Sequence, residues 1–470
     1  MRADDASQES PRPALRHLSG SIISVGASRA ASLAVIAITS IVVARMIGAA
    51  GIGSYAIGHA LLLVFTVLVE LGLPQATAYF VGREEWSGRA LSGGVIGLCF
   101  GLAVPGCLLM LAGYAAAGDS LPGIDWPMAI ALTVALPFSL LWRIGPQVAL
   151  AQERFEDFAL LDAAPALLLC PTSIVGAALG GTQGAVIGLG VATVASGLGI
   201  AAWLLRGPGR EAVAARLPGR VPAVIRFGLK AWGSELLMQV NLRVDLILVG
   251  LYAGATAGGV YSVALSTTGI AWVVTAAFAV SALPRSARLQ AHSERGLIEA
   301  RERDSRDARA LRHAVLVIPV AAAGILALLA VGIPLFYGSE FHRSISLGLI
   351  LLPGSLLLGV GMAAVSILLG RGEAMRVLRV GLAVVPATVL ACLLAIPSGG
   401  ATAAAIVSSC SYAGFALLAV GQLHAVSGLA LGGLLVPRRA DLDDYRELTR
   451  RVLSGLRRQQ RGVGGDDDPE

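Results

Sequence analysis

The chain has 470 residues, of which 56% are hydrophobic and only 14% are charged, and its mean hydropathy is +0.75. This composition excludes a soluble globular domain and predicts a protein that crosses a membrane many times. The formal net charge is +6. A basic chain can indicate a nucleic-acid partner, but the arginines gather in particular connections, which favours membrane topology and no nucleic acid.

Twelve apolar stretches are long enough to span the bilayer core, which needs about 20 helical residues. Because lipid satisfies no backbone hydrogen bonds, these spans are predicted to be α-helices. The fold class is therefore an all-α polytopic membrane protein with about twelve transmembrane helices. The predicted spans lie near residues 20–44, 55–80, 91–117, 127–150, 158–179, 183–205, 227–251, 259–283, 313–336, 344–370, 377–397 and 401–427.

The arginines are distributed unevenly between the two sides that these spans define. Connections on the side of the N-terminus carry nearly all of them, whereas the opposite connections carry only Arg45 and Arg343. Cytoplasmic connections are enriched in arginine, so both termini are predicted to be cytoplasmic, in a bacterial-type plasma membrane. Residues 1–19 are predicted to form a polar cytoplasmic tail rather than a signal peptide. Arg45 is expected to anchor a helix C-terminus at the outer surface.

An internal repeat divides the chain into two halves. The stretch IVVARMIGAAGIGSYAI, from Ile41, aligns without a gap to ILVGLYAGATAGGVYSV, from Ile247, a spacing of roughly 206 residues. Because each half holds six spans, the halves run in the same direction. Two pseudo-symmetric six-helix lobes around a central cavity follow. The aligned pairs are Gly48 with Gly254, Gly53 with Gly259, and Tyr55 with Tyr261.

The repeat sets the predicted domains. The N-lobe covers residues 20–205 and the C-lobe residues 227–427, with a basic cytoplasmic linker at 206–226. Residues 285–312 are predicted to form a cytoplasmic surface helix within the C-lobe. Residues 428–470 are predicted to form an amphipathic basic helix and then an acidic disordered tail. That helix either lies on anionic membrane lipids or is solvated.

The stretch from residue 227 to residue 261 combines an apolar span with many polar side chains. At about 100° per residue, one helix face carries Glu235, Gln239 and Arg243. Polar groups at this depth are costly in lipid, so they are expected to face protein or a water-filled cavity. A second face of the same helix carries Lys230, Asn241 and Asp245.

Other spans add charged side chains to the candidate cavity. Arg29 lies deep in the first span, and Arg143 with Gln147 forms a stripe one turn apart on the fourth. Each residue has a structural alternative: Lys230 can extend to the interface, and the arginines can belong to buried ion pairs. The predicted cavity residues are Arg29, Arg143, Gln147, Lys230, Asn241 and Arg243, and the predicted coupling or ion-pair residues are Glu70, Glu235 and Asp245.

No pattern of catalytic residues stands out. The five cysteines lie inside apolar runs without metal-ligand spacing, and no glycine-rich phosphate loop appears in a suitable context. We therefore expect neither an enzyme nor a metal or organic cofactor, although coupling to H⁺ or Na⁺ stays open. Glycine stripes are expected to pack helices closely, at Gly93, Gly97 and Gly101 and at Gly176, Gly180, Gly184 and Gly188.

Several motifs resemble those of the polysaccharide-transport branch of the multidrug/oligosaccharidyl-lipid/polysaccharide exporter superfamily, the O-antigen-type flippases. They are VARMIGAAGIGSYAIG, ELGLPQATAYFV, QVNLRVDLILVG, GGVYSVA, and PLFYGSEF followed by LILLPGSLLLG. Their order covers roughly residues 15–435. The resemblance implies a MATE-like fold of twelve or fourteen helices and movement of lipid-linked, pyrophosphate-bearing sugars across the plasma membrane.

The leading hypothesis is thus a flippase for a polyprenyl-pyrophosphate-linked glycan, with glycan-synthesis enzymes as further partners. An ion-coupled exporter of small amphiphiles is the main alternative. A membrane-integral glycan polymerase or transferase and a non-transporting scaffold remain as rivals from other classes. The short outer connections disfavour the polymerase, and the intramembrane charges disfavour the scaffold.

Overall fold

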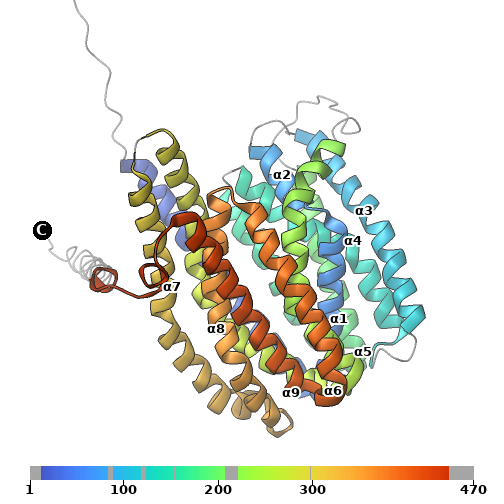
Figure 1. The fold of residues 1–470 in the computed structure, drawn as a ribbon. Coiled ribbons are helices and arrows are strands. Elements are labelled where there is room, and N and C mark those ends of the chain that lie inside the picture. Colours follow the sequence, from blue (N-terminus) through green and yellow to red (C-terminus); the bar gives the residue numbers. More distant parts are fainter. Residues whose placement is uncertain are drawn as a thin grey trace, which may run out of the picture. The chain divides into compact units, whose positions relative to one another are not determined.

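A computed structural model describes residues 12–82, 88–117, 123–152, 154–206, 221–296 and 298–443, and all regular structure in these ranges is helical (Figure 1). This agrees with the predicted all-α class. The elements are α1 (Arg12–Glu70), α2 (Leu73–Gly82), α3 (Gly88–Ala117), α4 (Trp126–Ala151), α5 (Phe155–Arg206), α6 (Val221–Glu294), α7 (Ala300–Ala327), η3 (Leu328–Tyr337), η4 (Ser339–Phe341), α8 (His342–Gly370), α9 (Ala374–Ser427) and α10 (Leu431–Leu435).

Eight helices among the described residues are long and apolar enough to cross a membrane. Four of the long elements are interrupted where the backbone leaves helical geometry at glycine. The interruptions are at Gly48 in α1, Gly180 and Gly181 in α5, Gly254 in α6 and Gly400 in α9. Each lies between two predicted spans. The count of twelve spans stays a prediction. The breaks lie where that count requires the chain to leave one span and enter the next.

The aligned glycines of the repeat share an unusual backbone conformation. Gly48 has φ 70° and ψ −176°, and Gly254 has φ 87° and ψ 168°. L-amino acids with a side chain rarely adopt such angles, so both corners need glycine.

The two copies of the repeat also contact each other reciprocally. A Cβ atom on Gly53 would lie 1.9 Å from the carbonyl oxygen of Ala255, and one on Gly259 would lie 1.8 Å from the carbonyl oxygen of Ala49. Ala49 and Ala255 are separated by the repeat spacing, as are the two glycines. The two corners therefore cross backbone to backbone about a local two-fold relation.

The predicted span 55–80 is broken in its middle. Helix α1 ends at Glu70, Leu71 and Gly72 have φ 46° and 72°, and α2 begins at Leu73. The break leaves carbonyl groups without helical partners. The indole Nε1 of Trp232 donates to one of them, the Val67 oxygen, at 2.7 Å.

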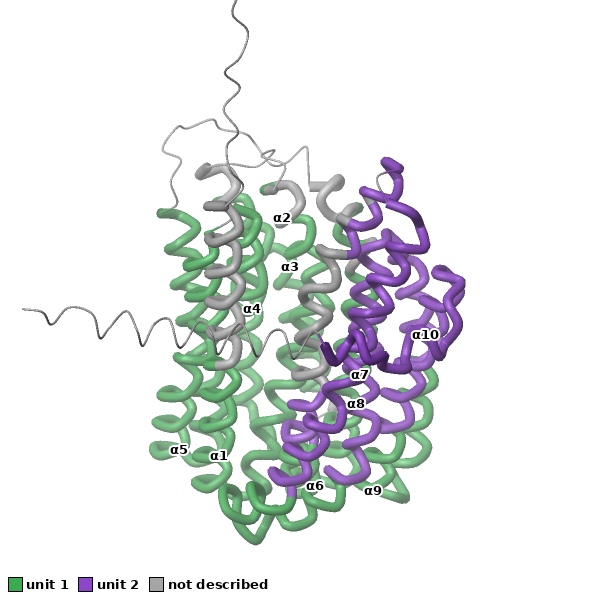
Figure 2. Tube along the Cα trace, turned by 90° about the vertical axis from the view of Figure 1, so that its left-hand side faces the viewer, with its two compact units in different colours: residues 1–264, 330–347, 385–407 green, residues 265–329, 348–384, 408–470 purple. Residues whose placement is uncertain are grey.

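The described structure divides into two compact units (Figure 2). Unit 1 comprises residues 1–264, 330–347 and 385–407. Its core surrounds α4, where Leu140, Leu141 and Ile144 are fully buried among apolar side chains of α1, α3 and α5. Helix α4 begins with Asp125 as N-cap, accepting a hydrogen bond of 3.1 Å from the Met128 amide.

Unit 2 comprises residues 265–329, 348–384 and 408–470. The predicted surface helix at 285–312 is wrong. Instead, α6 continues to Glu294, the chain turns at Gly296 with φ 70°, and α7 begins at Ala300. Gly296 permits this turn because glycine readily adopts a positive φ. The distribution of charges in the sequence did not indicate the turn.

The start of α7 is exposed on one side and buried on the other. Buried Arg371 donates through Nε to Asp307 at 2.8 Å and lies 2.9 Å from Asp304. Ser286 donates to the same Asp307 carboxylate at 3.2 Å. Two of the five acids in residues 285–312, Asp304 and Asp307, are therefore ion-pair partners inside unit 2, whereas Glu294, Glu299 and Glu302 are exposed.

The two glycine stripes behave differently. In α5, a Cβ on Gly176 would lie 2.0 Å from the Gly184 oxygen, so this pair packs closely as predicted. At Gly93, Gly97 and Gly101 of α3, an added Cβ would meet nothing within 4 Å. The prediction of close packing by that stripe is wrong, because these glycines do not face a neighbouring helix in the described structure.

The crossing of the repeats yields a stability prediction. Gly53→Val places a branched side chain against the Ala255 carbonyl, and overpacking of this kind costs about 1–3 kcal/mol. The melting temperature of the purified protein should fall accordingly. The matched control, Gly97→Ala, adds a methyl group in open space within a helix and should leave the melting temperature unchanged or slightly raised. Equal melting temperatures for wild type and Gly53→Val would contradict the crossing.

Candidate functional site

Three charged side chains from α1, α4 and α6 meet inside unit 1. Arg143 donates through Nε to Oε2 of Glu70 at 2.5 Å and through Nη2 to Oε1 of Glu70 at 3.1 Å. The same Nη2 donates to Oε1 of Glu235 at 3.1 Å. We call Glu70, Arg143 and Glu235 the charge triad.

The two carboxylates of the charge triad are bound differently. Glu70 receives both arms of the guanidinium fork and its side chain is 0% exposed, whereas Glu235 receives one bond and is 34% exposed. A bidentate pair is stronger and geometrically more demanding than a single bond. Glu70 therefore binds Arg143 more firmly than Glu235 does.

Local structure explains the need for the fixed pair. Glu70 is the last residue of α1, where the unsatisfied carbonyls carry partial negative charge. A carboxylate at this end is unfavourable without a compensating cation. Arg143 supplies that cation. Formally the charge triad carries one positive and two negative charges.

The face of α6 that holds Glu235 continues as predicted. Gln239 donates to Glu235 at 3.5 Å, and Arg243 lies one further turn along the helix. Arg243 is half-buried and close enough to His59 of α1 for an electrostatic interaction. Glu235, Gln239 and Arg243 therefore form a row of polar side chains along α6, and Arg243 lies near α1.

The second polar face of α6 is more deeply buried. Asn241 is 1% exposed and Asp245 is 0% exposed. Asp245 accepts a hydrogen bond of 2.5 Å from Tyr261 and one of 2.7 Å from the Leu246 amide. Asp245 thus links α6 before and after the Gly254 break through a hydrogen bond, and its predicted role in coupling or in an ion pair stays a prediction.

The remaining predicted residues are placed less fully. Gln147 is half-buried one turn beyond Arg143 on α4. Arg29 lies on α1 and Lys230 on α6, but their side chains lie outside the described part of the structure. The structure therefore brings together Glu70, Arg143 and Glu235, with Arg243 on the same face of α6.

A second group of contacts, the corner seam, joins residues 45–53, 255–260 and 335–344. Arg45 donates to the carbonyls of Leu335 and Phe336 at 2.7 Å each, at the C-terminal end of η3. Glu340 accepts a hydrogen bond of 3.1 Å from the Ala49 amide, just after the α1 break. A cation caps a helix C-terminus while an anion caps a helix start, which is favourable at both ends.

The seam is completed by α8. Ser344 donates to the Val260 carbonyl at 2.7 Å and is fully buried. Together with the Gly53 and Gly259 crossing, these bonds hold both repeat corners against the segment after η3.

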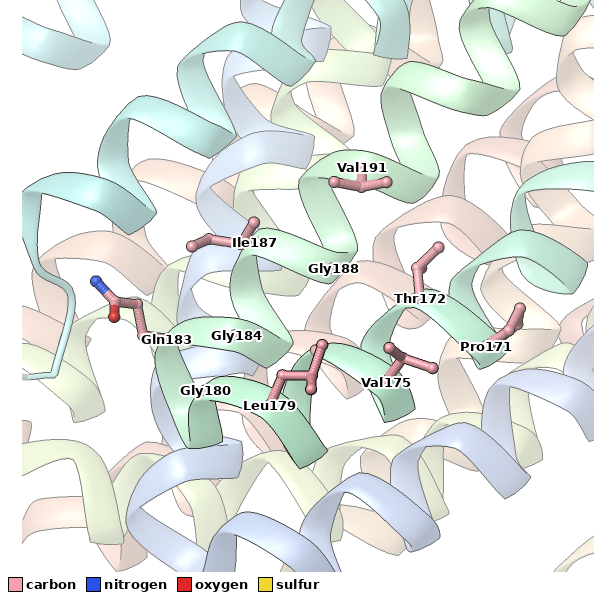
Figure 3. A pocket seen from close by; sticks show the side chains of 11 residues that line it. Pro171, Thr172, Val175, Leu179, Gly180, Gln183, Gly184, Ile187, Gly188 and Val191 are labelled. Atoms are coloured by element: carbon pink, nitrogen blue, oxygen red, sulfur yellow. The ribbon is translucent and has the colours of Figure 1, made fainter.

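An apolar groove of about 550 Å³ lies along α5 and is not part of the polar site. Figure 3 shows its side chains, including Val175, Leu179 and Val191 on either side of the Gly180 break. Its polar lining side chains are Thr172 and Gln183, and none of its lining residues is charged. The groove therefore offers no counter-charge to a charged ligand.

Sequence reasoning overlooked several polar partners. His59 and Trp232 lie near the ends of predicted spans, and Glu340 belongs to a short connection. None of the three therefore stood out as a polar group inside the membrane. For Tyr261 a signal existed, because its alignment with Tyr55 marked the position. Its pairing with Asp245 needed the tertiary structure.

The charge triad yields a stability prediction. Arg143→Met leaves the buried Glu70 carboxylate without a counter-charge, which typically costs about 3–5 kcal/mol. Protein abundance and melting temperature should fall. The double variant Arg143→Met/Glu70→Gln should recover most of the loss, and Glu235→Gln alone should cost less because the Glu235 side chain is already 34% exposed. An Arg143→Met variant as stable as wild type would rule out the pairing.

Comparison with solved structures shows the fold. A lipid II flippase MurJ in an inward closed conformation superposes with a TM-score of 0.65 at 14% identity, over 85% of this chain and 87% of that one. An outward-facing multidrug resistance MATE family transporter gives 0.61 at 15% identity, over 87% and 96%. The MATE multidrug transporter DinF-BH gives 0.60 at 15% identity, over 91% and 100%.

A search of curated proteins found no match to this sequence. The family model described as polysaccharide biosynthesis protein matches residues 20–290, more than half of the chain. The helical, multi-span fold and this match agree with the resemblance that the motifs indicated. The chain is therefore a multi-pass membrane protein that belongs to the polysaccharide biosynthesis protein family, a family of transporters with the MATE-like fold rather than of enzymes.

Proposed function

We propose that this protein flips a polyprenyl-pyrophosphate-linked oligosaccharide across the plasma membrane, with the two predicted lobes alternating in opening to either side. The observation that carries the proposal is the charge triad. Glu70 and Arg143 come from the predicted N-lobe and Glu235 from the predicted C-lobe, so the bond of 3.1 Å between Arg143 and Glu235 joins the lobes. Family membership supplies the substrate class.

The geometry supports an exchange mechanism. Arg143 is held by Glu70 whether or not Glu235 is bound, so it stays oriented when the second partner leaves. A pyrophosphate oxygen is chemically equivalent to the Glu235 carboxylate as an acceptor for Nη2. Substrate arriving from the cytoplasm displaces Glu235 and so separates the lobes on that side. Arg243, with Arg29 and Lys230, provides further positive charge along the path.

The corner seam forms the opposite closure in this proposal. By the predicted topology it lies on the outer side, and it joins the two repeat corners through Gly53 and Gly259. Outward opening requires the Arg45 and Glu340 caps to break. In this reading the glycine breaks at residues 48, 180–181, 254 and 400 separate the eight long helices into twelve spans.

One observation favours a second candidate function. The charge triad has two carboxylates and one guanidinium, and a net negative site attracts cations. An exporter of cationic amphiphiles coupled to H⁺ or Na⁺ fits that charge. Proteoliposomes distinguish the two functions: the flippase moves a polyprenyl-pyrophosphate-linked sugar to the far leaflet, where an impermeant oxidant reaches it. Transport of a cationic dye with no movement of the lipid-linked sugar would establish the exporter instead.

Arg243 provides the sharpest test of the substrate path. We expect Arg243→Ala and Arg29→Ala each to lower flipping at least tenfold while abundance and melting temperature change little, because a cation that meets substrate adds little to folding. Arg243→Lys should restore flipping in part, since lysine keeps the charge but loses the fork. Arg226→Ala, an exposed arginine on the same helix, is the matched control.

Normal flipping by both alanine variants would remove these arginines from the path. If an alanine variant fails to accumulate, and neutralising Glu235 or Glu70 restores its abundance, then Arg243 or Arg29 belongs to a structural ion pair instead.

The predicted topology has its own test. Because the arginines lie on one side, both termini and residues 285–312 are expected to face the cytoplasm. In a variant whose five native cysteines are replaced, Ala300→Cys should therefore resist an impermeant maleimide in sealed cells and react after permeabilisation. Strong labelling of residue 300 from outside would overturn the topology and the two-lobe proposal with it.

A further inference from the structure

The segment that follows α9, residues 428–443, is held firmly on α7 within unit 2. We call it the C-terminal strap. Arg312 donates to both carboxylate oxygens of Asp441, at 2.7 and 3.1 Å, and to the Gly433 carbonyl at 2.8 Å. Leu434 is 1% exposed. Figure 1 shows the strap, in dark red, leaving the end of α9.

The anchoring pair is charged at neutral pH. Burial raises the pKa of Asp441, but the hydrogen bonds from Arg312 and the Arg438 amide, with the charge of Arg312, outweigh it and hold the pKa below its ordinary value. The strap is therefore fixed by a full ion pair rather than by loose packing.

The predicted topology puts both ends of the strap's anchorage at the cytoplasmic boundary of the membrane. Arg312 directly precedes the predicted span 313–336, and the strap begins where α9 ends, at Ser427, with Gly428 in the left-handed conformation. A segment anchored to both lies at the level where two spans leave the hydrocarbon.

The exposed side of the strap combines apolar and basic residues. Leu431, Val436 and Leu442 are 50%, 60% and 47% exposed. Arg438 and Arg439 are exposed between them. Of the two acids in residues 428–443, Asp441 is buried and Asp443 is exposed. Because Arg312 compensates Asp441, the exposed charge is positive. Apolar residues beside arginines at this depth are typical of segments that lie in the lipid headgroup region.

We propose that the C-terminal strap is a docking surface for anionic phospholipid headgroups of the cytoplasmic leaflet. Arg438 and Arg439 contact the headgroup phosphates, and Leu431 and Val436 enter the upper acyl region. The charge complementarity and the level of the strap select a lipid over a soluble anion. The inference goes beyond glycan flipping and does not depend on which substrate is moved.

The test measures lipid binding to the purified full-length protein. Phosphatidylglycerol is titrated in detergent and the bound lipid is counted by native mass spectrometry. Each arginine near an anionic surface contributes on the order of 1 kcal/mol, so Arg438→Ala/Arg439→Ala should weaken binding about 10–30-fold. Arg295→Ala/Arg301→Ala changes the charge equally at exposed sites in the predicted 285–312 linker and should bind like wild type.

Three further arms make the outcome decisive. Wild type should bind phosphatidylcholine more weakly than phosphatidylglycerol, and Leu431→Ser/Val436→Ser should weaken binding of both lipids. Inorganic phosphate alone should show no saturable binding. The proposal is overturned if the Arg438/Arg439 variant binds like wild type, if the control loses as much, or if light scattering shows a dimer that only the Arg438/Arg439 variant disrupts.

Discussion

An arginine shared between two carboxylates is the interaction on which unit 1 depends. A carboxylate at the end of α1, buried from solvent, is tolerable only because Arg143 binds it with both arms. The same side chain then reaches Glu235 on α6. Taking these charges out of water is costly, so the pair adds orientation more than stability. That orientation is what the proposed exchange of Glu235 for a phosphate oxygen requires.

Backbone contacts between glycines set how closely the repeats approach. At Gly53 and Gly259 a single Cβ would collide with a carbonyl oxygen, and at Gly48 and Gly254 the backbone adopts angles that favour glycine. Side chains cannot interdigitate at such a crossing. Charged side chains that cap helix ends add further contacts there: Arg45 binds the end of η3, and Glu340 binds the amide of Ala49.

Unit 2 uses its charges differently. Arg371 is buried with Asp304 and Asp307, and Arg312 with Asp441. Arginines that contribute to the predicted positive-inside pattern therefore also form buried ion pairs. A topology signal read from charge counts therefore says little about which arginines remain exposed. Arg438 and Arg439 do remain exposed, and the lipid proposal rests on that difference.

By itself the sequence determined the all-helical, multi-span class, the repeat and the polar faces of the helix after residue 227, because hydropathy and helical periodicity are local properties. The motif order indicated the family. The tertiary structure alone decided that Glu70 and Arg143 pair, that Asp245 meets Tyr261, that span 55–80 breaks at Leu71, and that the Gly93 stripe faces no helix in the described structure. Those outcomes depend on which faces of distant segments meet, and no local pattern in the chain encodes that.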